Sequence, residues 1–195
     1  IHELRATGHA FSQRQGLLFI GGFRHTPNID AMKWFIGEIW PLVHAKLPDI
    51  GITIVGSNMP DSIRALAGLG VNVAGFVEDI DSLLDAARIS VAPLRYGAGV
   101  KGKINQAMAC GLPVVATSLA VEGMNLQNGV DILVADTPQD FADAIVRLHD
   151  DETLWNSLAD GGRENVRRYF SRETAKKTLA GLLGFEEDPS CKDFG

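Results

Sequence analysis

Short apolar runs that alternate with helix-like patterns constrain the fold of this chain more than any other feature. The runs are rich in Val, Ile, Leu and Ala along their whole length, without regular alternation of apolar and polar residues. Strands buried on both faces of a parallel sheet have this composition. The predicted strands cover residues 17–20, 52–55, 71–74, 89–92, 113–116 and 132–135.

Helical patterns fill the segments between the predicted strands. Thr26-Pro27 has the form of an N-cap hydroxyl followed by proline at the first helical position, and an apolar stripe runs from there to Leu47. Gly161-Gly162 predicts a weak point in a long helix. The predicted helices cover residues 26–47, 60–69, 79–87, 104–108, 137–149, 151–169 and a stretch from 171. This alternation predicts an α/β fold, a Rossmann-like doubly wound parallel sheet of about six strands with helices on both faces.

The first four predicted strands each lead into a loop that contains glycine. These loops begin at Gly21, Gly56, Gly75 and Pro93, and we call them together the carboxyl rim. In open parallel sheets the ligand lies beyond the carboxyl ends of the strands. The sequence therefore predicts a binding site at the carboxyl rim.

The last of these loops, LRYGAGVKGKINQAM from Leu94 to Met108, joins a predicted strand to a predicted helix. Its three glycines allow backbone N–H groups to approach an anion, and a helix N-terminus adds partial positive charge. Lys101 and Lys103 add cations. The stretch is therefore typical of a phosphate-binding loop.

Bulk composition limits the classes of function. The chain has 195 residues, 46% of them hydrophobic, and a net charge of −6, which argues against a general nucleic-acid-binding surface. It contains neither an apolar run of the ~20 residues that span a bilayer nor a signal-peptide pattern. Two cysteines give no disulfide framework, and we expect Cys110 in the core and a cytoplasmic setting. Because position 1 is Ile, we expect a piece of a longer protein.

The predicted domain organisation is simple. Residues 1–16 are interpreted as a linker or the tail of a preceding domain, residues 17–184 as one Rossmann-like domain, and the acidic residues 185–195 as a disordered tail.

Two other nucleotide-binding folds contain loops similar to this phosphate-binding loop. Gly97 to Lys103 fits G-x-x-x-x-G-K of a P-loop NTPase, but Ile104 stands where the Mg²⁺-binding Ser or Thr is needed. An NAD-dependent oxidoreductase would need G-x-G-x-x-G after the first strand, where Gly21-Gly22-Phe23-Arg24 stands. Both remain remote alternatives.

From Leu17 to Leu183 the chain resembles the C-terminal, donor-binding domain of a GT-B glycosyltransferase, in the retaining, glycogen-synthase-like group 1 (family 4). The resemblance rests on LFIGG at 18–22, IVG at 54–56, VAGFV at 73–77, and GAGVKGK at 97–103 followed by QAMACGLPVVAT at 106–117. It implies the C-terminal half of a GT-B fold. It also implies transfer of a hexosyl unit from a UDP- or GDP-sugar to a glycan, lipid or small-molecule acceptor, without a metal or other cofactor.

The resemblance further implies roles for individual residues. Val77, through its backbone, and Glu78 contact the base, and the loop 97–102 lies under the sugar and diphosphate. Family members usually carry glutamates where Ala98 and Gln106 stand here. Gln106 can still bond a ribose hydroxyl, whereas Ala98 cannot hold the sugar. The expected donor-binding residues are Gly21, Gly22, Gly56, Val77, Glu78, Tyr96, Gly97, Ala98, Gly99, Val100, Lys101, Gln106 and Glu122.

The cations that stabilise the leaving group also differ from the family pattern. Many relatives carry Arg and Lys where Gly22 and Asn28 stand here. Negative charge on the departing nucleoside diphosphate must be neutralised without a metal in this fold. We therefore predict that Lys103 points to the phosphate and that Arg24 assists it.

The remaining expectations concern metal and partners. Asp79-Ile80-Asp81 spells the DxD of metal-dependent transferases, but Asp79 or Asp81 is predicted to cap the following helix, and no metal is expected. The expected partners are a nucleotide-sugar and a missing N-terminal acceptor-binding domain, through which the protein associates peripherally with the cytoplasmic face of a membrane. A nucleotide-binding module without transfer activity is the alternative that Ala98 and Gln106 suggest.

Overall fold

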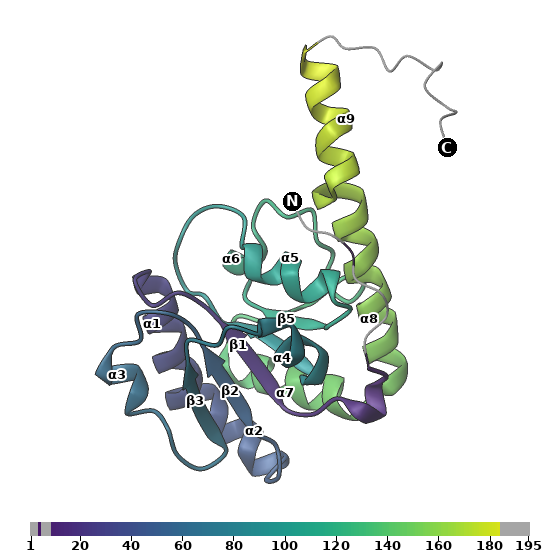
Figure 1. Ribbon diagram of the computed structural model, residues 1–195. Helices are drawn as coiled ribbons and strands as arrows, with labels where there is room; N and C mark the ends of the chain where they lie inside the picture. Colours follow the sequence, from purple (N-terminus) through teal and green to yellow (C-terminus); the bar gives the residue numbers. More distant parts are fainter. Residues whose placement is uncertain (1–3, 5–8, 184–195) are drawn as a thin grey trace.

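The computed structural model describes residue 4 and residues 9–183, and its centre is one six-stranded parallel sheet with the order β3-β2-β1-β4-β5-β6 (Figure 1). This confirms the predicted α/β class and the strand positions to within two residues. The strands are β1 (Leu17–Ile20), β2 (Ile52–Val55), β3 (Val71–Gly75), β4 (Ile89–Ala92), β5 (Val114–Ala116) and β6 (Leu133–Val134).

Helices cover both faces of this sheet. The α-helices are α1 (Thr26–Trp34), α2 (Trp40–Lys46), α3 (Asp61–Arg64), α4 (Ile80–Ala86), α5 (Gly102–Ala109), α6 (Ser118–Val121), α7 (Pro138–Asp150), α8 (Glu152–Asn165) and α9 (Arg172–Leu183). A 3₁₀ turn, η1 (Phe11–Gln13), precedes them, and π-helical turns η2 (Phe35–Ile39) and η3 (Val166–Phe170) interrupt two of the helical stretches. The doubly wound arrangement is thereby confirmed.

The core has two halves, one on each face of the sheet. In every strand except β3, residues on the two faces enter opposite halves, as Ile89 and Ala92 of β4 do. One half is closed by α1, η2, α2 and α7, and the other by α4, α5 and α6. The edge strand β3 departs from the prediction of fully buried strands, because its Asn72 and Ala74 are exposed. An edge strand with one open face alternates, as β3 does.

The helix predicted over residues 26–47 is one stretch of three parts, α1, η2 and α2. Proline at position 41 has no N–H to donate, and the π turn of η2 ends two residues before it. The predicted N-cap at Thr26 is wrong, because His25 occupies the cap position with an extended backbone. Among the described side chains none caps this helix end, but Pro27 has no N–H and the Asn28 N–H donates to the carbonyl oxygen of His25 at 3.0 Å.

The predicted weak point at Gly161-Gly162 is also wrong. α8 runs through both glycines without a break. At these two positions the neighbouring chain passes too close for a side chain to fit. A Cβ on Gly161 would lie 2.1 Å from the carbonyl oxygen of Val130, and one on Gly162 would lie 3.0 Å from the side chain of Met108. These glycines therefore let α8 pack closely. The predicted helix at 60–69 is confirmed only in its first part, as α3.

The segment before β1 packs against the domain. The Arg14 side chain is 1% exposed and donates to the carbonyl oxygens of Leu84 (2.7 Å), Ala87 (3.1 Å) and Cys110 (3.3 Å). Cys110 itself is buried, as expected. The boundaries at residues 16 and 184 stay predictions, and residues 185–195 lie outside the described part of the chain.

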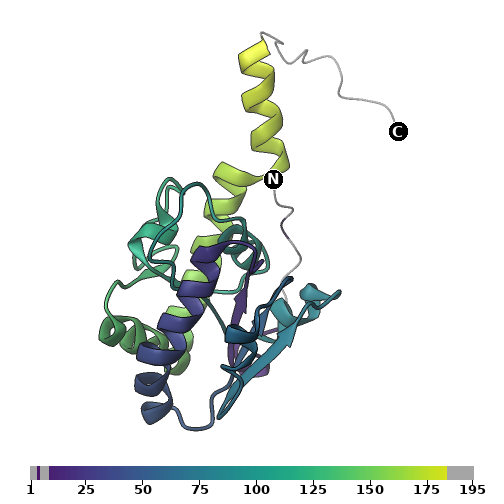
Figure 2. The ribbon, with the colours of Figure 1, turned by 90° about the vertical axis from the view of Figure 1, so that its left-hand side faces the viewer.

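At the other end, α9 extends away from the sheet in both views (Figures 1 and 2). In the described part of the chain no helix has the length and apolarity needed to cross a membrane.

Candidate functional site

Backbone hydrogen bonds join the loops of the carboxyl rim. Gly21 N–H donates to Val55 (3.0 Å), Phe23 N–H to Ser57 (2.9 Å) and Gly56 N–H to Gly75 (2.8 Å). The loops that follow β1, β2 and β3 therefore lie side by side, as the sequence predicts for a parallel sheet.

The fourth loop of the rim is tied to the start of α1 by three contacts. Arg95 Nε donates to Asp30 Oδ2 at 2.9 Å, and Lys103 Nζ donates to Asn28 Oδ1 at 2.6 Å. Between them a Cβ on Gly97 would lie 3.3 Å from the ring of Pro27. Gly97 has φ 120°, a conformation that favours glycine. These contacts hold the starts of α1 and α5 close together.

Both helix starts are open to an anion. The first turns contain no Asp or Glu, and among the described side chains none caps either N-terminus. At α1 Pro27 has no N–H and the Asn28 N–H is bonded to the His25 oxygen, so the helix dipole, more than free N–H groups, makes this start favourable for negative charge. The two ends therefore add their partial positive charges at the same part of the rim.

Lys103 is the cation between these two helix starts. Its amine lies 4.3 Å from the centre of the Phe19 ring and is enclosed, while the side chain as a whole keeps partial exposure. Burial, and to a smaller extent the positive charge of Lys101, lowers the pKa of the Lys103 amine from its usual value near 10.5 to about 7.

Lys101 has a different role in the structure. Its amine donates to the carbonyl oxygens of Gly99 (2.6 Å) and Gly97 (3.2 Å), and the side chain is half-buried. Lys101 therefore stabilises the curled loop from within. The sequence could place two lysines in this loop but could not distinguish these two environments.

The other expected donor-binding residues lie along the carboxyl rim or close to it in the fold. Val77 packs against the core with its side chain, so its backbone is the part left for contact, and Gln106 is partly buried in α5. Exposed side chains form the rest of the set: Arg24, Glu78, Tyr96, Ala98, Val100 and Glu122. Their contacts with a donor stay predictions.

Sequence reasoning missed two residues. Asn28 was identified only as the place of a missing lysine, yet it is the hydrogen-bond partner of Lys103. Phe76 is 74% exposed directly after β3, although a large apolar residue at a strand end favours burial. Its position directly before Val77, an expected contact of the base, was the sequence signal that could have identified it.

Asp79 caps α4, as predicted. Its carboxylate accepts from the backbone N–H of Ser82 at 3.1 Å. The described residues contain no group of three His, Cys, Asp or Glu side chains arranged to hold a metal ion.

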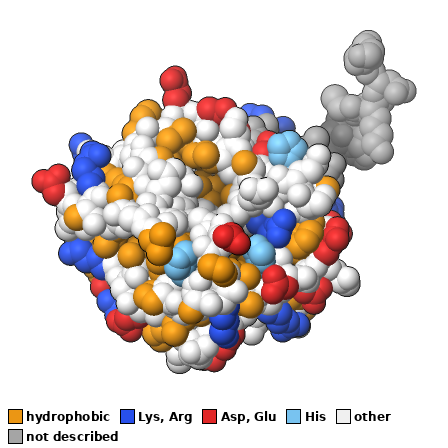
Figure 3. Space-filling view, turned by 90° about the horizontal axis from the view of Figure 1, so that it is seen from below, with side chains coloured by type: hydrophobic (Ala, Val, Ile, Leu, Met, Phe, Trp, Pro, Cys, Tyr) orange, Lys and Arg blue, Asp and Glu red, His pale blue; other side chains and the backbone are white. Residues whose placement is uncertain are grey.

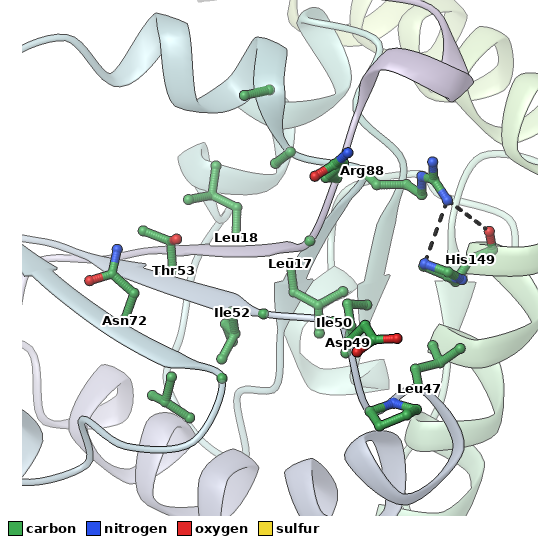
Figure 4. A pocket seen from close by; sticks show the side chains of 18 of the residues that line it. Leu17, Leu18, Leu47, Asp49, Ile50, Ile52, Thr53, Asn72, Arg88 and His149 are labelled. Carbon is green, nitrogen blue, oxygen red and sulfur yellow. Dashed lines mark hydrogen bonds between the residues drawn. The ribbon is translucent and has the colours of Figure 1, made fainter.

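A large open cavity, about 940 Å³, lies at the opposite, amino ends of β1, β2 and β3 (Figure 4). Arg88 and His149 lie on its wall, but the guanidinium donates to backbone oxygens of Arg14 (2.9 Å) and Phe11 (3.2 Å). It also contacts the oxygen of His149 at 3.4 Å. Acidic and basic side chains are interspersed on the face seen in Figure 3. The uncapped helix starts and Lys103 do not line this cavity; they lie at the carboxyl rim.

The family model for group 1 glycosyl transferases matches residues 14–151. The chain belongs to this family. It is 28% identical over 139 residues to an uncharacterised 44.6 kDa protein of the cps region of Klebsiella pneumoniae, a match that covers 67% of this chain and 36% of that protein. It is also 29% identical over 169 residues to the phosphatidyl-myo-inositol mannosyltransferase of Mycobacterium tuberculosis, with 80% and 44% covered.

Solved structures agree on the fold. The structure of S. aureus TarM in complex with fondaparinux, alpha-GlcNAc-glycerol and UDP superposes with a TM-score of 0.78 at 20% identity, over 93% of this chain and 38% of that one. The chain therefore spans less than half the length of these relatives. The fold and the family predicted by resemblance are confirmed.

Proposed function

We propose that this chain is the donor-binding domain of a retaining, metal-independent glycosyltransferase. The enzyme transfers a hexosyl unit from a nucleotide-sugar to a glycan, lipid or small-molecule acceptor. The observation that carries the proposal is the pair of uncapped helix ends of α1 and α5, held together around Lys103 at the carboxyl rim. Family membership supports the reaction class, and UDP in the TarM complex supports a nucleoside diphosphate as ligand.

The proposed chemistry is departure of a diphosphate from the sugar. Negative charge develops on the phosphate oxygens as the glycosidic bond breaks. The dipoles of the two helix starts and the Lys103 ammonium oppose that charge, with Arg24 as an exposed second cation on the β1–α1 loop. No protein nucleophile and no cofactor beyond the donor itself enter the proposal.

The rest of the enzyme is proposed to lie in a domain that precedes this one and holds the acceptor. That domain would also provide peripheral contact with the cytoplasmic face of a membrane. The location of the whole protein in the cytoplasm belongs to the same proposal.

A donor-binding module without transfer activity is the second candidate. Ala98 favours it, because a methyl group cannot hydrogen-bond a sugar hydroxyl, and Gln106 replaces a carboxylate by a neutral amide. Both candidates require nucleotide binding, and only the first requires turnover.

The test uses the full-length protein. Binding of UDP and GDP is measured by calorimetry, and release of each nucleoside diphosphate from its hexose conjugates is measured with and without candidate acceptors. Binding with turnover and a retained anomeric configuration, read by NMR, supports the enzyme. Binding without turnover supports the second candidate. If neither nucleoside diphosphate binds at millimolar concentration, both are wrong.

A further inference from the structure

The Lys103 amine lies among neutral groups. It donates to the amide oxygen of Asn28 and lies against the face of the Phe19 ring. Within the described residues it forms no ion pair with a carboxylate. A buried ammonium without a counter-ion is costly, and the neutral amine is then the favoured form.

The orientation of the Asn28 amide is fixed by its surroundings. Its Nδ2 donates to the carbonyl oxygen of Gly22 at 2.8 Å, which leaves Oδ1 to face Lys103 at 2.6 Å. The reverse orientation would place two oxygens against each other. Asn28 is 7% exposed, and Gly21 packs so closely that a Cβ on it would lie 2.9 Å from Asn28 Cγ. Asn28 therefore joins the β1–α1 loop to α5 through one rigid amide.

We propose that Asn28 is a positioning residue, which holds the Lys103 amine under the diphosphate so that this amine takes up a proton when the diphosphate binds. The inference rests on the proposed function. The proton comes from solvent or buffer and turns the neutral amine into an ammonium. A diphosphate brings the negative charge that the empty site lacks, and so it stabilises the charged form.

The charged groups around the amine favour this direction of coupling. Lys101 at the start of α5 opposes protonation in the empty site. On the β1–α1 side the titratable neighbours in sequence are Arg24 and His25, neither of which supplies negative charge. Asp30 in α1 is bonded by both Nε and Nη2 of Arg95. The ligand is therefore the anion best placed to charge Lys103.

Calorimetry with the full-length protein measures the proton directly. UDP and GDP are titrated at pH 8 in two buffers of different ionisation enthalpy, and the difference in heat gives the number of protons taken up. With a pKa of about 7, about nine tenths of the amine is neutral at pH 8, so close to one proton is expected per diphosphate bound. Uridine or guanosine, which lacks the phosphates, should bring no proton.

Two substitutions separate positioning from mere structural support. Lys103→Arg stays charged at pH 8, so it should bind the diphosphate with no proton uptake. Asn28→Asp places a carboxylate at the amine and should likewise remove the uptake. It also sets one carboxylate oxygen against the Gly22 carbonyl, so circular dichroism is used to check that this variant folds. Asn72→Asp, on exposed β3, is the matched control and should leave the proton number unchanged. Carbon-13 NMR of the lysine ε-carbons should show one resonance titrating near pH 7 that Lys103→Arg removes.

The outcomes distinguish failure of this inference from failure of the proposed function on which it rests. Diphosphate binding without proton uptake by the unsubstituted protein overturns this inference and leaves the proposed function standing. Uptake that persists in Lys103→Arg overturns it too, because another group then takes the proton. Failure of UDP and GDP to bind overturns the proposed function itself, and this inference with it.

Discussion

Gly56 and Gly21 meet backbone to backbone at the carboxyl rim, where a Cβ on Gly56 would lie 1.8 Å from the carbonyl oxygen of Gly21. The carbonyl carbon of Gly21 and the ring of Phe23 would also be within 3.0 Å of that Cβ. The obstacle is main chain of the neighbouring loop and cannot move as a flexible side chain would. The two loops can approach this closely only because position 56 has no side chain.

We therefore expect Gly56→Ala to destabilise the domain and to spread the rim. Overpacking costs typically 1–3 kcal/mol, and a contact this short on backbone should reach at least the upper end, about 3 kcal/mol. Urea denaturation followed by circular dichroism measures the loss. Gly37→Ala is the matched control, since no described atom lies within 4 Å of a Cβ at that helical position. Its change should be neutral or stabilising by up to about 1 kcal/mol. Equal stability of the two variants would contradict the close approach.

Removal of the Lys103 charge should weaken binding of diphosphates selectively. A hydrogen bond to a charged group contributes about 1.5–3 kcal/mol, so Lys103→Met should weaken UDP or GDP binding by roughly tenfold to a hundredfold. Binding of the corresponding nucleoside should change little, because the amine lies at the helix starts and not at the loop after β3. Lys33→Met, on the exposed side of α1, is the control. Equal losses for nucleoside and diphosphate would place Lys103 elsewhere in the site.

The same lysine should make the stability of the unliganded domain depend on pH. Its pKa is lowered in the folded state, so between about pH 7 and the unfolded value near 10.5 the unfolded chain binds more protons. The free energy of unfolding should therefore rise with pH in this window, by at most about 1.4 kcal/mol per pH unit from this group. Below about pH 7 the contribution is constant.

Urea denaturation of the natural chain and of Lys103→Met at several pH values isolates this contribution. Other groups titrate equally in both, so the difference in unfolding free energy should favour the natural chain increasingly from pH 7 to pH 10. A difference that stays constant over this range would show that the amine keeps its charge in the folded protein.

The sequence predicted the layout of this domain well because its signals are local. Apolar runs and glycines at their ends determine where parallel strands stop, and the parallel sheet then brings those ends to one rim. The surroundings of individual side chains were harder to predict. Lys101 and Lys103 are two residues apart at the start of α5, yet the Lys101 amine bonds carbonyl oxygens of the preceding loop and the Lys103 amine bonds a side chain 75 residues away. Gly161 and Gly162 are a similar case, because the close contacts that require glycine there come from Val130 and Met108, which are distant in sequence.

Many relatives carry an arginine where Gly22 stands, and the structure leaves room for that side chain. A Cβ at this position would lie 3.7 Å from Ser57 Oγ and 4.0 Å from the His25 ring, both ordinary contacts, and its backbone is not in the left-handed region. Gly22→Arg should therefore fold and place a guanidinium at the rim beside the start of α1. We expect UDP or GDP to bind about threefold to tenfold more tightly, as one exposed charge contact contributes about 1 kcal/mol.

Gly22→Gln is the control, since it has a long polar side chain without the charge. The gain of the arginine variant should shrink as salt is raised, because exposed charges are screened, whereas the glutamine variant should respond to salt as the natural chain does. Calorimetric titrations of the three proteins at low and at physiological ionic strength make the comparison. If arginine and glutamine change the affinity alike, position 22 does not face the phosphates, and the site lies farther along the rim toward the loop after β3.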